Sequence, residues 1–149
     1  MGVYLTLYDA VVTKLTTAHT GGILLGVTKQ IFTGNVDRDI LGNTPCVIIH
    51  AANNQGETWA ALPSSRDARL VFEIRCVAKH KEISGLDNER SAIRLMELVT
   101  RVLLTDLDLS GAAEIINTTI QTIENVGDET YHVVMNFDTQ KRFIATVDL

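Results

Sequence analysis

Residues 67–79, DARLVFEIRCVAK, constrain the fold of this chain more than any other segment, because their side chains alternate in character. One alternate set is apolar and comprises Leu70, Phe72, Ile74, Cys76 and Ala78. The other set mixes both charge signs with valine and comprises Arg69, Val71, Glu73, Arg75 and Val77. Successive side chains of a strand project to opposite faces of a sheet, so this pattern predicts a strand with one face against a core.

The pattern changes after the turn-like sequence ISGLDN. Apolar residues then recur at steps of three and four, at Ala92, Leu95, Met96, Val99, Val102 and Leu103. That spacing predicts an amphipathic helix whose buried stripe covers the apolar face of the sheet. We expect Asp87 to cap the helix N-terminus and Glu97 to pair with Arg101 on its exposed side.

The remaining segments predict further elements of both kinds. A helix is expected over residues 3–18, where an apolar stripe runs through Tyr4, Leu7, Tyr8, Val11, Val12 and Leu15. A short strand or turn is expected around Gly34, and Pro45 opens an apolar strand that is covered on both faces. Residues 53–67 form a long polar segment, interpreted as a loop.

The C-terminal third favours strands. Residues 112–126 are rich in Ile and Thr, and their alternation breaks between Ile116, Ile120 and Ile123, which predicts a bulge. Residues 130–147 are expected to form either two strands of a hairpin or one long, interrupted strand. The prediction is therefore an α+β fold in a single domain spanning residues 1–149: a mostly antiparallel sheet with an N-terminal helix and a central long helix packed on one face.

Charge and composition narrow the function. The net charge is −5 and the 13 basic residues are dispersed, which argues against a surface built to grip nucleic acid. No apolar run is long enough to cross a bilayer, and the N-terminal residues lack the basic region of a signal peptide, so no membrane partner is expected. The two cysteines, Cys46 and Cys76, lie in apolar segments and are interpreted as reduced core thiols.

The sequence carries no local motif for catalysis. The four histidines are far apart and none has a partner at metal-ligand or triad spacing, and no phosphate-binding or nucleophile-elbow motif occurs. No local pattern therefore commits this chain to catalysis, and no cofactor and no metal are expected. The alternative from another class is a small enzyme or ligand-binding module whose site assembles from His50, His132 and the long loop.

Two features suggest a docking surface. The valine-bearing face of the 67–79 strand, with Arg69, Val71, Glu73, Arg75 and Val77, is typical of a face that contacts a neighbour, although β-propensity alone also explains the valines. Trp59, the single tryptophan, is a candidate anchor for a partner in the long loop, because tryptophan is enriched at interface hot spots. The alternative is that Trp59 folds back on the core.

The order of these segments resembles that of bacteriophage neck proteins of the tail terminator or tail-to-head joining type. The resemblance comprises the amphipathic YLTLYDAVVTKL, the proline-led TPCVIIHA, the loop ETWAALPSSRDA and the long strand RLVFEIRCVAK. It continues through the helix from NERSAI to VTRVLL and a closing pair of strands.

This resemblance implies a structural virion protein that is not an enzyme and that forms a homo-oligomeric ring, commonly a hexamer, after assembly in the host cytoplasm. The alternative within the same class is another neck or tail-tube component. Such a ring stops growth of the tail tube, contacts the tail tube protein on one side and a head-side connector on the other, and lets DNA pass through its lumen. An acidic lining suits that passage, because like charge keeps the duplex from binding. Ring closure is expected to be heterologous, with the valine-bearing face in ring contacts and the 53–67 loop in axial contacts.

Overall fold

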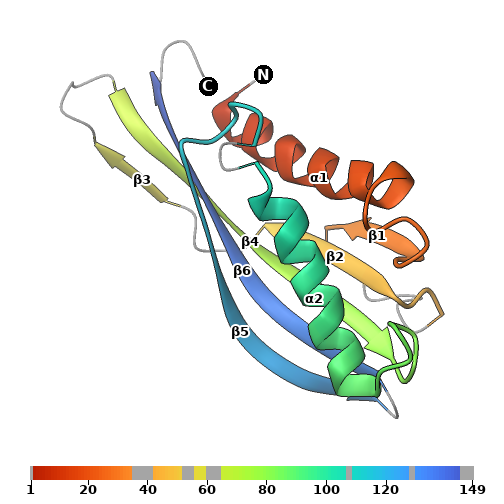
Figure 1. Cartoon of the computed structure of the whole chain (residues 1–149). Coiled ribbons are helices and arrows are strands. Elements are labelled where there is room, and N and C mark those ends of the chain that lie inside the picture. Colours follow the sequence, from red (N-terminus) through yellow and green to blue (C-terminus); the bar gives the residue numbers. More distant parts are fainter. Residues whose placement is uncertain are drawn as a thin grey trace.

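The computed structural model describes residues 2–34, 42–51, 56–59, 65–106, 109–127 and 130–144. In chain order its elements are α1 (Val3–Gly21), β1 (Gln30–Thr33), β2 (Cys46–Ala51), β3 (Gly56–Trp59), β4 (Ser65–Lys79), α2 (Asn88–Leu104), β5 (Ile115–Gly127) and β6 (Thr130–Ile144). The fold is α+β, and both predicted helices are present. Figure 1 shows the two helices lying on the same side of one curved sheet.

The sheet is built around β4, the strand that the alternating pattern predicted. The strand order is β1-β2-β4-β6-β5, and β3 pairs with the part of β4 that extends beyond β2. β1 and β2 are parallel, and every other pairing is antiparallel. β4 and β6 pair along their full fifteen residues, which makes this ladder the spine of the sheet.

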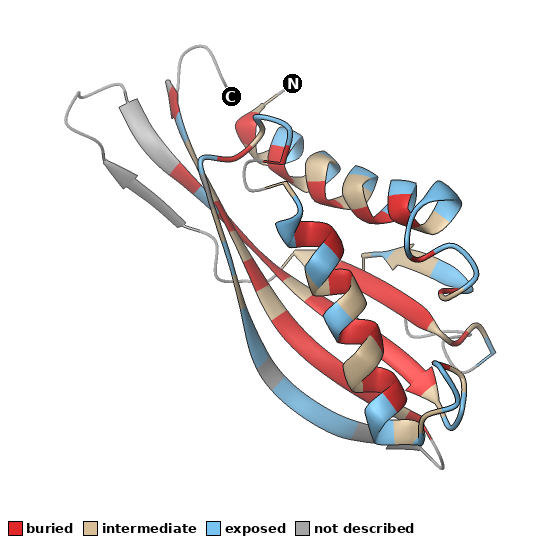
Figure 2. Ribbon diagram, in the orientation of Figure 1, coloured by how far each residue is buried: buried red, intermediate tan, exposed pale blue. Residues whose placement is uncertain are grey.

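The core lies between the helices and the inner face of the sheet, as predicted. The apolar set of β4 is buried there, beside the apolar stripes of both helices and the inner residues of β6. The rings of Tyr8 and Phe72 lie 5.9 Å apart, so α1 packs directly over the middle of β4. Figure 2 shows buried residues along the surfaces of α1 and α2 that face the sheet. Burial of this continuous apolar face supplies the main stabilisation of the fold.

The start of α2 confirms one prediction, and its exposed side corrects another. The Asp87 carboxylate accepts a hydrogen bond of 2.9 Å from the backbone N–H of Arg90, which is a true N-cap. Glu97, however, accepts from Arg94 at 2.8 Å, and no ion pair with Arg101 forms. Positions three residues apart are also neighbours on a helix surface, so the spacing allowed both partners.

The structure tests the expectations for the C-terminal strands and for the long loop. The predicted irregularity in β5 is present, because its pairing with β6 shifts register between Ile120 and Thr122. Residues 130–144 form one long strand, β6, rather than a hairpin, and the expected interruption is absent from it. The loop expected over residues 53–67 contains strand β3 (Gly56–Trp59) and the start of β4 at Ser65, so this part of the prediction is wrong. A strand of four residues is too short to show a hydrophobic period.

The outer face of the sheet, which points away from the helices, carries a small apolar cluster of its own. Cys46, Ile48 and Val77 are buried together there, with Phe32 packed against them. Val77 is only 1% exposed and Val71 only 4%. The sequence pattern placed both valines on the correct face, but the expectation that they offer exposed contact area is wrong.

The reason lies in the strands on either side of β4. Val77 lies opposite Cys46 on β2 and opposite His132 on β6, so it is flanked across both ladders. Val71 lies opposite Asp138, which binds Arg69 of the same strand. These cross-strand neighbours contribute to the burial of both valines, and the periodicity of a single strand cannot reveal them.

The two cysteines are free and buried, as predicted. They lie on adjacent strands, but Cys76 is paired with Val47 and Cys46 with Val77. Because directly paired residues share a face, Cys46 projects to the outer face and Cys76 into the main core. This opposite orientation keeps the two thiols from bridging.

Candidate assembly surfaces

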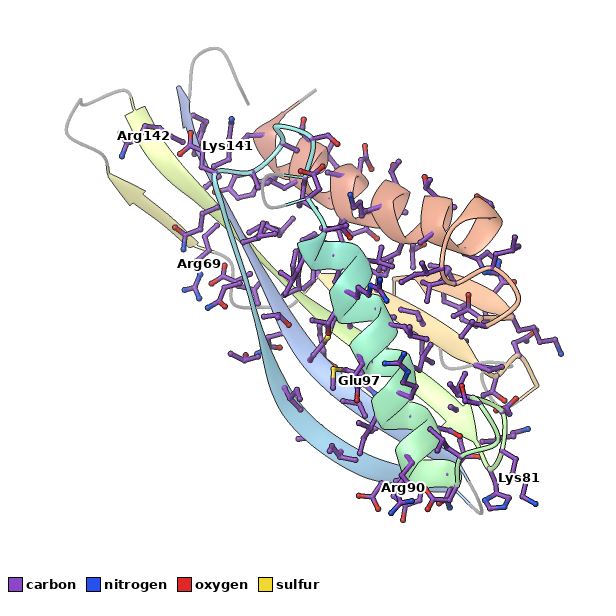
Figure 3. The ribbon with its side chains drawn as sticks, viewed as in Figure 1. Arg69, Lys81, Arg90, Glu97, Lys141 and Arg142 are labelled. Atoms are coloured by element: carbon purple, nitrogen blue, oxygen red, sulfur yellow. The ribbon has the colours of Figure 1, made fainter. Side chains whose placement is uncertain are left out.

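The predicted contact residues of β4 form a charged strip along the outer face of the sheet. Arg69 makes a bidentate contact with Asp138 of β6, with hydrogen bonds of 2.8 to 3.1 Å. Figure 3 shows Arg69 projecting from the sheet away from α2. The hydrogen bond and the charge of Asp138 both raise the pKa of Arg69, which stays cationic. Arg75 pairs with Glu73 two residues away, at 2.7 Å.

This strip can fix the orientation of a partner but offers little apolar area. Its two valines are buried, and the guanidinium groups of Arg69 and Arg75 are already paired within the chain. Exposed ion pairs of this kind contribute little free energy to association and act mainly on specificity. A partner that docks on this face would therefore contact mostly charged and polar groups.

Trp59 is the last residue of β3, and its backbone pairs with Arg66 of β4. Its side chain lies outside the described residues, as do residues 52–55 and 60–64 of the predicted loop. The candidate anchor role of Trp59 therefore stays a prediction. Strand β3 lies at the end of the sheet that carries the start of β4 (Figure 1), and Trp59 is paired there with Arg66.

The two histidines of the alternative site do not come together. His50 lies opposite Glu73, and His132 lies opposite Val77, four residues further along β4 and on its other side. At the usual rise and spacing of strands, their backbones are about 16 Å apart. His132 instead pairs with Glu124 of β5, with 3.0 Å between Nε2 and Oε2. Within the described ranges, no three metal-ligating side chains are grouped in space.

The strand β5 forms a long edge that sequence reasoning did not single out as a surface. In the described part of the chain it pairs only with β6, so one side of its backbone has no strand partner. Ile120 is 56% exposed and Ile123 is 42% exposed. Figure 2 shows most of β5 as an exposed ribbon beside α2. Unpaired edges with apolar side chains are the parts of a sheet most prone to associate with another chain.

A second surface missed from the sequence is an open groove of about 920 Å³ between the two helices. α1 provides one wall, and the last turn of α2 with the segment that follows it provides the other. Its lining residues are Thr6, Asp9, Ala10, Thr13, Lys14, Thr17, Ala18, Thr20, Gly21, Gly22, Ile23, Arg101, Val102, Thr105, Leu109, Ser110 and Ala112. The groove is mainly apolar, and Lys14 bridges its walls through an ion pair of 3.7 Å with Asp106.

Neither surface has a local sequence signature. The groove is lined mostly by α1, with Arg101 and Val102 of α2 and the segment that follows α2, so its existence depends on how α1 and α2 pack. The edge position of β5 follows from the strand order, which the periodicity does not encode. For the β5 surface, the sequence offered one signal, the break in alternation at Ile120. This break leaves Ile120 and Ile123 outside the regular alternation of the strand.

Comparison with known proteins adds no assignment: the sequence matches no protein-family model and no curated protein sequence. None of the helices in the described ranges is sufficiently long and apolar to span a bilayer. The function must therefore be argued from the surfaces themselves.

Proposed function

We propose that this protein is a structural subunit of a tailed bacteriophage virion and forms a homo-oligomeric ring at the head-proximal end of the tail. In this role the ring terminates growth of the tail tube and joins the tail to the head, and DNA passes through its lumen. The proposal starts from the resemblance in segment order. The α+β architecture, with two helices on one face of a mostly antiparallel sheet, is compatible with it.

The observation that carries the proposal is the exposed edge of β5. A thirteen-residue edge strand with Ile120 and Ile123 exposed is poorly suited to a protein that acts alone in solution. Natural sheets protect such edges with charges, proline or a covering element. The described side chains of β5 include a single charged one, Glu124. A neighbouring subunit is the simplest cover for this edge.

The charge of the chain supports the same role. A ring of several copies multiplies the net charge of −5, and a lumen lined with part of that charge repels the phosphates of passing DNA. Partners above and below the ring are a head-side connector and the tail tube protein. The charged strip on β4 and the segment around Trp59 are the candidate contact regions for these partners.

Electron microscopy of the purified protein tests this proposal. We expect negatively stained particles with a central channel, and we expect the same rings at one end of tail tubes assembled with the tail tube protein. The matched control is the tail tube protein alone, whose tubes should have no cap and uncontrolled length. Tubes that are neither capped nor limited in length when the protein is present would contradict the proposed role.

The groove between α1 and α2 favours a second candidate from another class, a small ligand-binding module. Its volume of about 920 Å³ lies within the usual range of ligand pockets, about 300–1,000 Å³. The groove is open, however, and Lys14 in its lining is already paired with Asp106. A protein that stays monomeric and is stabilised against heat by a small molecule would support this second candidate.

A further inference from the structure

We propose that the open edge of β5 binds the same edge of a second copy in antiparallel orientation, with Ile120 of each copy opposite Ile123 of the other. This inference goes beyond the proposed function, because the contact joins two copies whether or not they continue into a ring. The contact is isologous, so it differs from the heterologous contact expected for ring closure. A ring that uses it needs a second interface.

The two isoleucines form an apolar pair on the inner face of the sheet. Ile120 lies opposite Met135 and Ile123 opposite Val133, and both β6 residues belong to the main core. The pairing of β5 with β6 skips residue 121, so the two isoleucines share a face although they are three residues apart. Both are about half exposed, because α2 reaches β5 only marginally. An apolar pair therefore lies open beside a free backbone edge.

The lengths of the strands favour a second β5 as the partner. β5 has thirteen residues, whereas β1 and β3 have four each. Within the described ranges, β1, β3 and β5 are the strands that pair on one side only. A second β5 is therefore the one edge of this chain that can match the full length of β5.

Antiparallel pairing is the orientation that brings the apolar pairs together. A two-fold axis perpendicular to the sheet keeps the inner faces of both copies on the same side. Parallel pairing of the same two edges needs a two-fold axis along the strands, which turns the inner face of one copy over. The isoleucines of the two copies would then lie on opposite faces of the joined sheet.

The register follows from the positions of the isoleucines in the strand. With the axis midway between them, each isoleucine of one copy meets an isoleucine of the other, and four apolar side chains are covered together. Residue 121 is also the midpoint of Ile115–Gly127, so this register pairs nearly the whole strand. An axis at Ile120 would instead place Ile123 opposite Thr118.

The same register keeps like charges apart. Glu124 carries the single charge among the described side chains of β5 and contacts His132 of its own chain. In the proposed register Glu124 lies opposite Thr119 of the second copy. The two Glu124 residues are then four strand positions apart, about 13 Å at the usual rise of a strand. This distance exceeds the Debye length of about 8 Å at physiological salt, so repulsion between them is screened.

Disulfide cross-linking between two full-length variants tests the register. Chains with Ile120→Cys and chains with Ile123→Cys are mixed under reducing conditions and then oxidised. We expect a cross-linked band at twice the 16.4 kDa of one chain on a non-reducing gel. The matched control replaces Ile123→Cys by Thr118→Cys, which this register holds about 13 Å from position 120 of the other copy, too far for a disulfide. Oxidised wild type is the blank, because its Cys46 and Cys76 are buried.

A second pair of variants tests the apolar contact. Ile120→Thr with Ile123→Thr removes the apolar side chains and keeps β-branched residues in the strand. The matched control is Ile23→Thr with Leu25→Thr, a similarly exposed apolar pair in the turn after α1. Circular dichroism establishes that each variant is folded, and analytical ultracentrifugation measures association. The β5 variant should have a dissociation constant at least about tenfold above that of the wild type, and the control should match the wild type.

The outcomes separate this inference from the proposed function. Dimers that show the expected cross-link and grow no further would support the inference and contradict the ring. Rings without the cross-link, or rings that persist in the β5 variant, would overturn the inference and leave the ring standing. A cross-link in the Thr118→Cys control would also overturn the proposed register. A wild type that stays a single chain at every concentration would overturn both.

Discussion

Ile120 of β5 lies directly opposite Met135 of β6, yet Met135 is fully buried and Ile120 keeps 56% of its surface exposed. The Met135 sulfur lies 3.5 Å from the Thr100 hydroxyl of α2, which covers it. α2 packs mainly over β4 and β6 and reaches β5 only marginally. This mismatch leaves an apolar edge that a second chain can cover, and it is the physical basis of the assembly that we propose.

The buried outer face of β4 predicts that Val77→Glu destabilises the fold. Val77 is 1% exposed and packs with Cys46 and Ile48, so a carboxylate there loses its hydration in an apolar cluster. The expected loss in the free energy of unfolding is several kcal/mol, roughly 2–7, measured by urea denaturation. The matched control is Thr122→Glu at an exposed position of β5, which should change stability little. Equal unfolding midpoints for the two variants would show that Val77 is accessible.

The N-cap of α2 predicts a smaller loss of stability than the one expected for Val77→Glu. Asp87→Ala removes the carboxylate that accepts from the N–H of Arg90 and should lower the free energy of unfolding by about 1 kcal/mol. Asp87→Asn keeps an acceptor and should restore most of that loss. Denaturation of the three proteins side by side measures the difference. A full loss in the asparagine variant would mean that the charge, rather than the hydrogen bond, stabilises the helix.

Cys46 predicts a dependence of stability on pH. Burial raises the pKa of this thiol from about 9 to about 12, and the charge of Glu82 adds to the rise. The unfolded chain therefore loses this proton at a lower pH than the folded chain. The contribution of the thiol to stability is full below pH ~9 and is lost as the pH rises toward 12.

The comparison of the wild type with Cys46→Ala isolates that contribution. The stability advantage of the wild type over the variant should shrink when urea denaturation is repeated at pH 8 and pH 11. Other groups titrate in both proteins and cancel in the difference. An advantage that stays constant between the two pH values would show that the thiol is not buried.

Trp59 predicts a binding effect that is separate from stability. If it anchors a head-side or tail-side partner, Trp59→Ala should weaken docking with little change in the free energy of unfolding. Because it is the single tryptophan, the fluorescence of the wild type should change on docking and report the affinity directly. A loss of about 3–5 kcal/mol in stability, typical of a buried tryptophan, would instead place this side chain in the core.

Much of the fold could be predicted because its main elements have strong periodicity. The alternation of residues 67–79 gave the inner and outer faces of β4 correctly, and the helical stripe gave the buried side of α2. The broken alternation near Ile120 correctly predicted the register shift in β5. These features are local in the sequence, so they are visible without the tertiary structure.

The surfaces could not be predicted because they depend on contacts between distant segments. Periodicity assigned Val71 and Val77 to a face, but only the positions of β2 and β6 determine that the two valines are enclosed. In the same way, helix spacing allows Glu97 to pair with either Arg94 or Arg101, and only the structure shows that Arg94 is its partner. The groove arises from the packing of α1 beside the end of α2, and no motif in either helix marks it.

The central claim is that the chain assembles with itself into a closed ring, and the mass of the wild-type protein in solution tests it most directly. Native mass spectrometry across a range of protein concentrations should show one dominant species at a fixed whole-number multiple of 16.4 kDa, with few intermediates. A single species at 16.4 kDa at every concentration would contradict the claim.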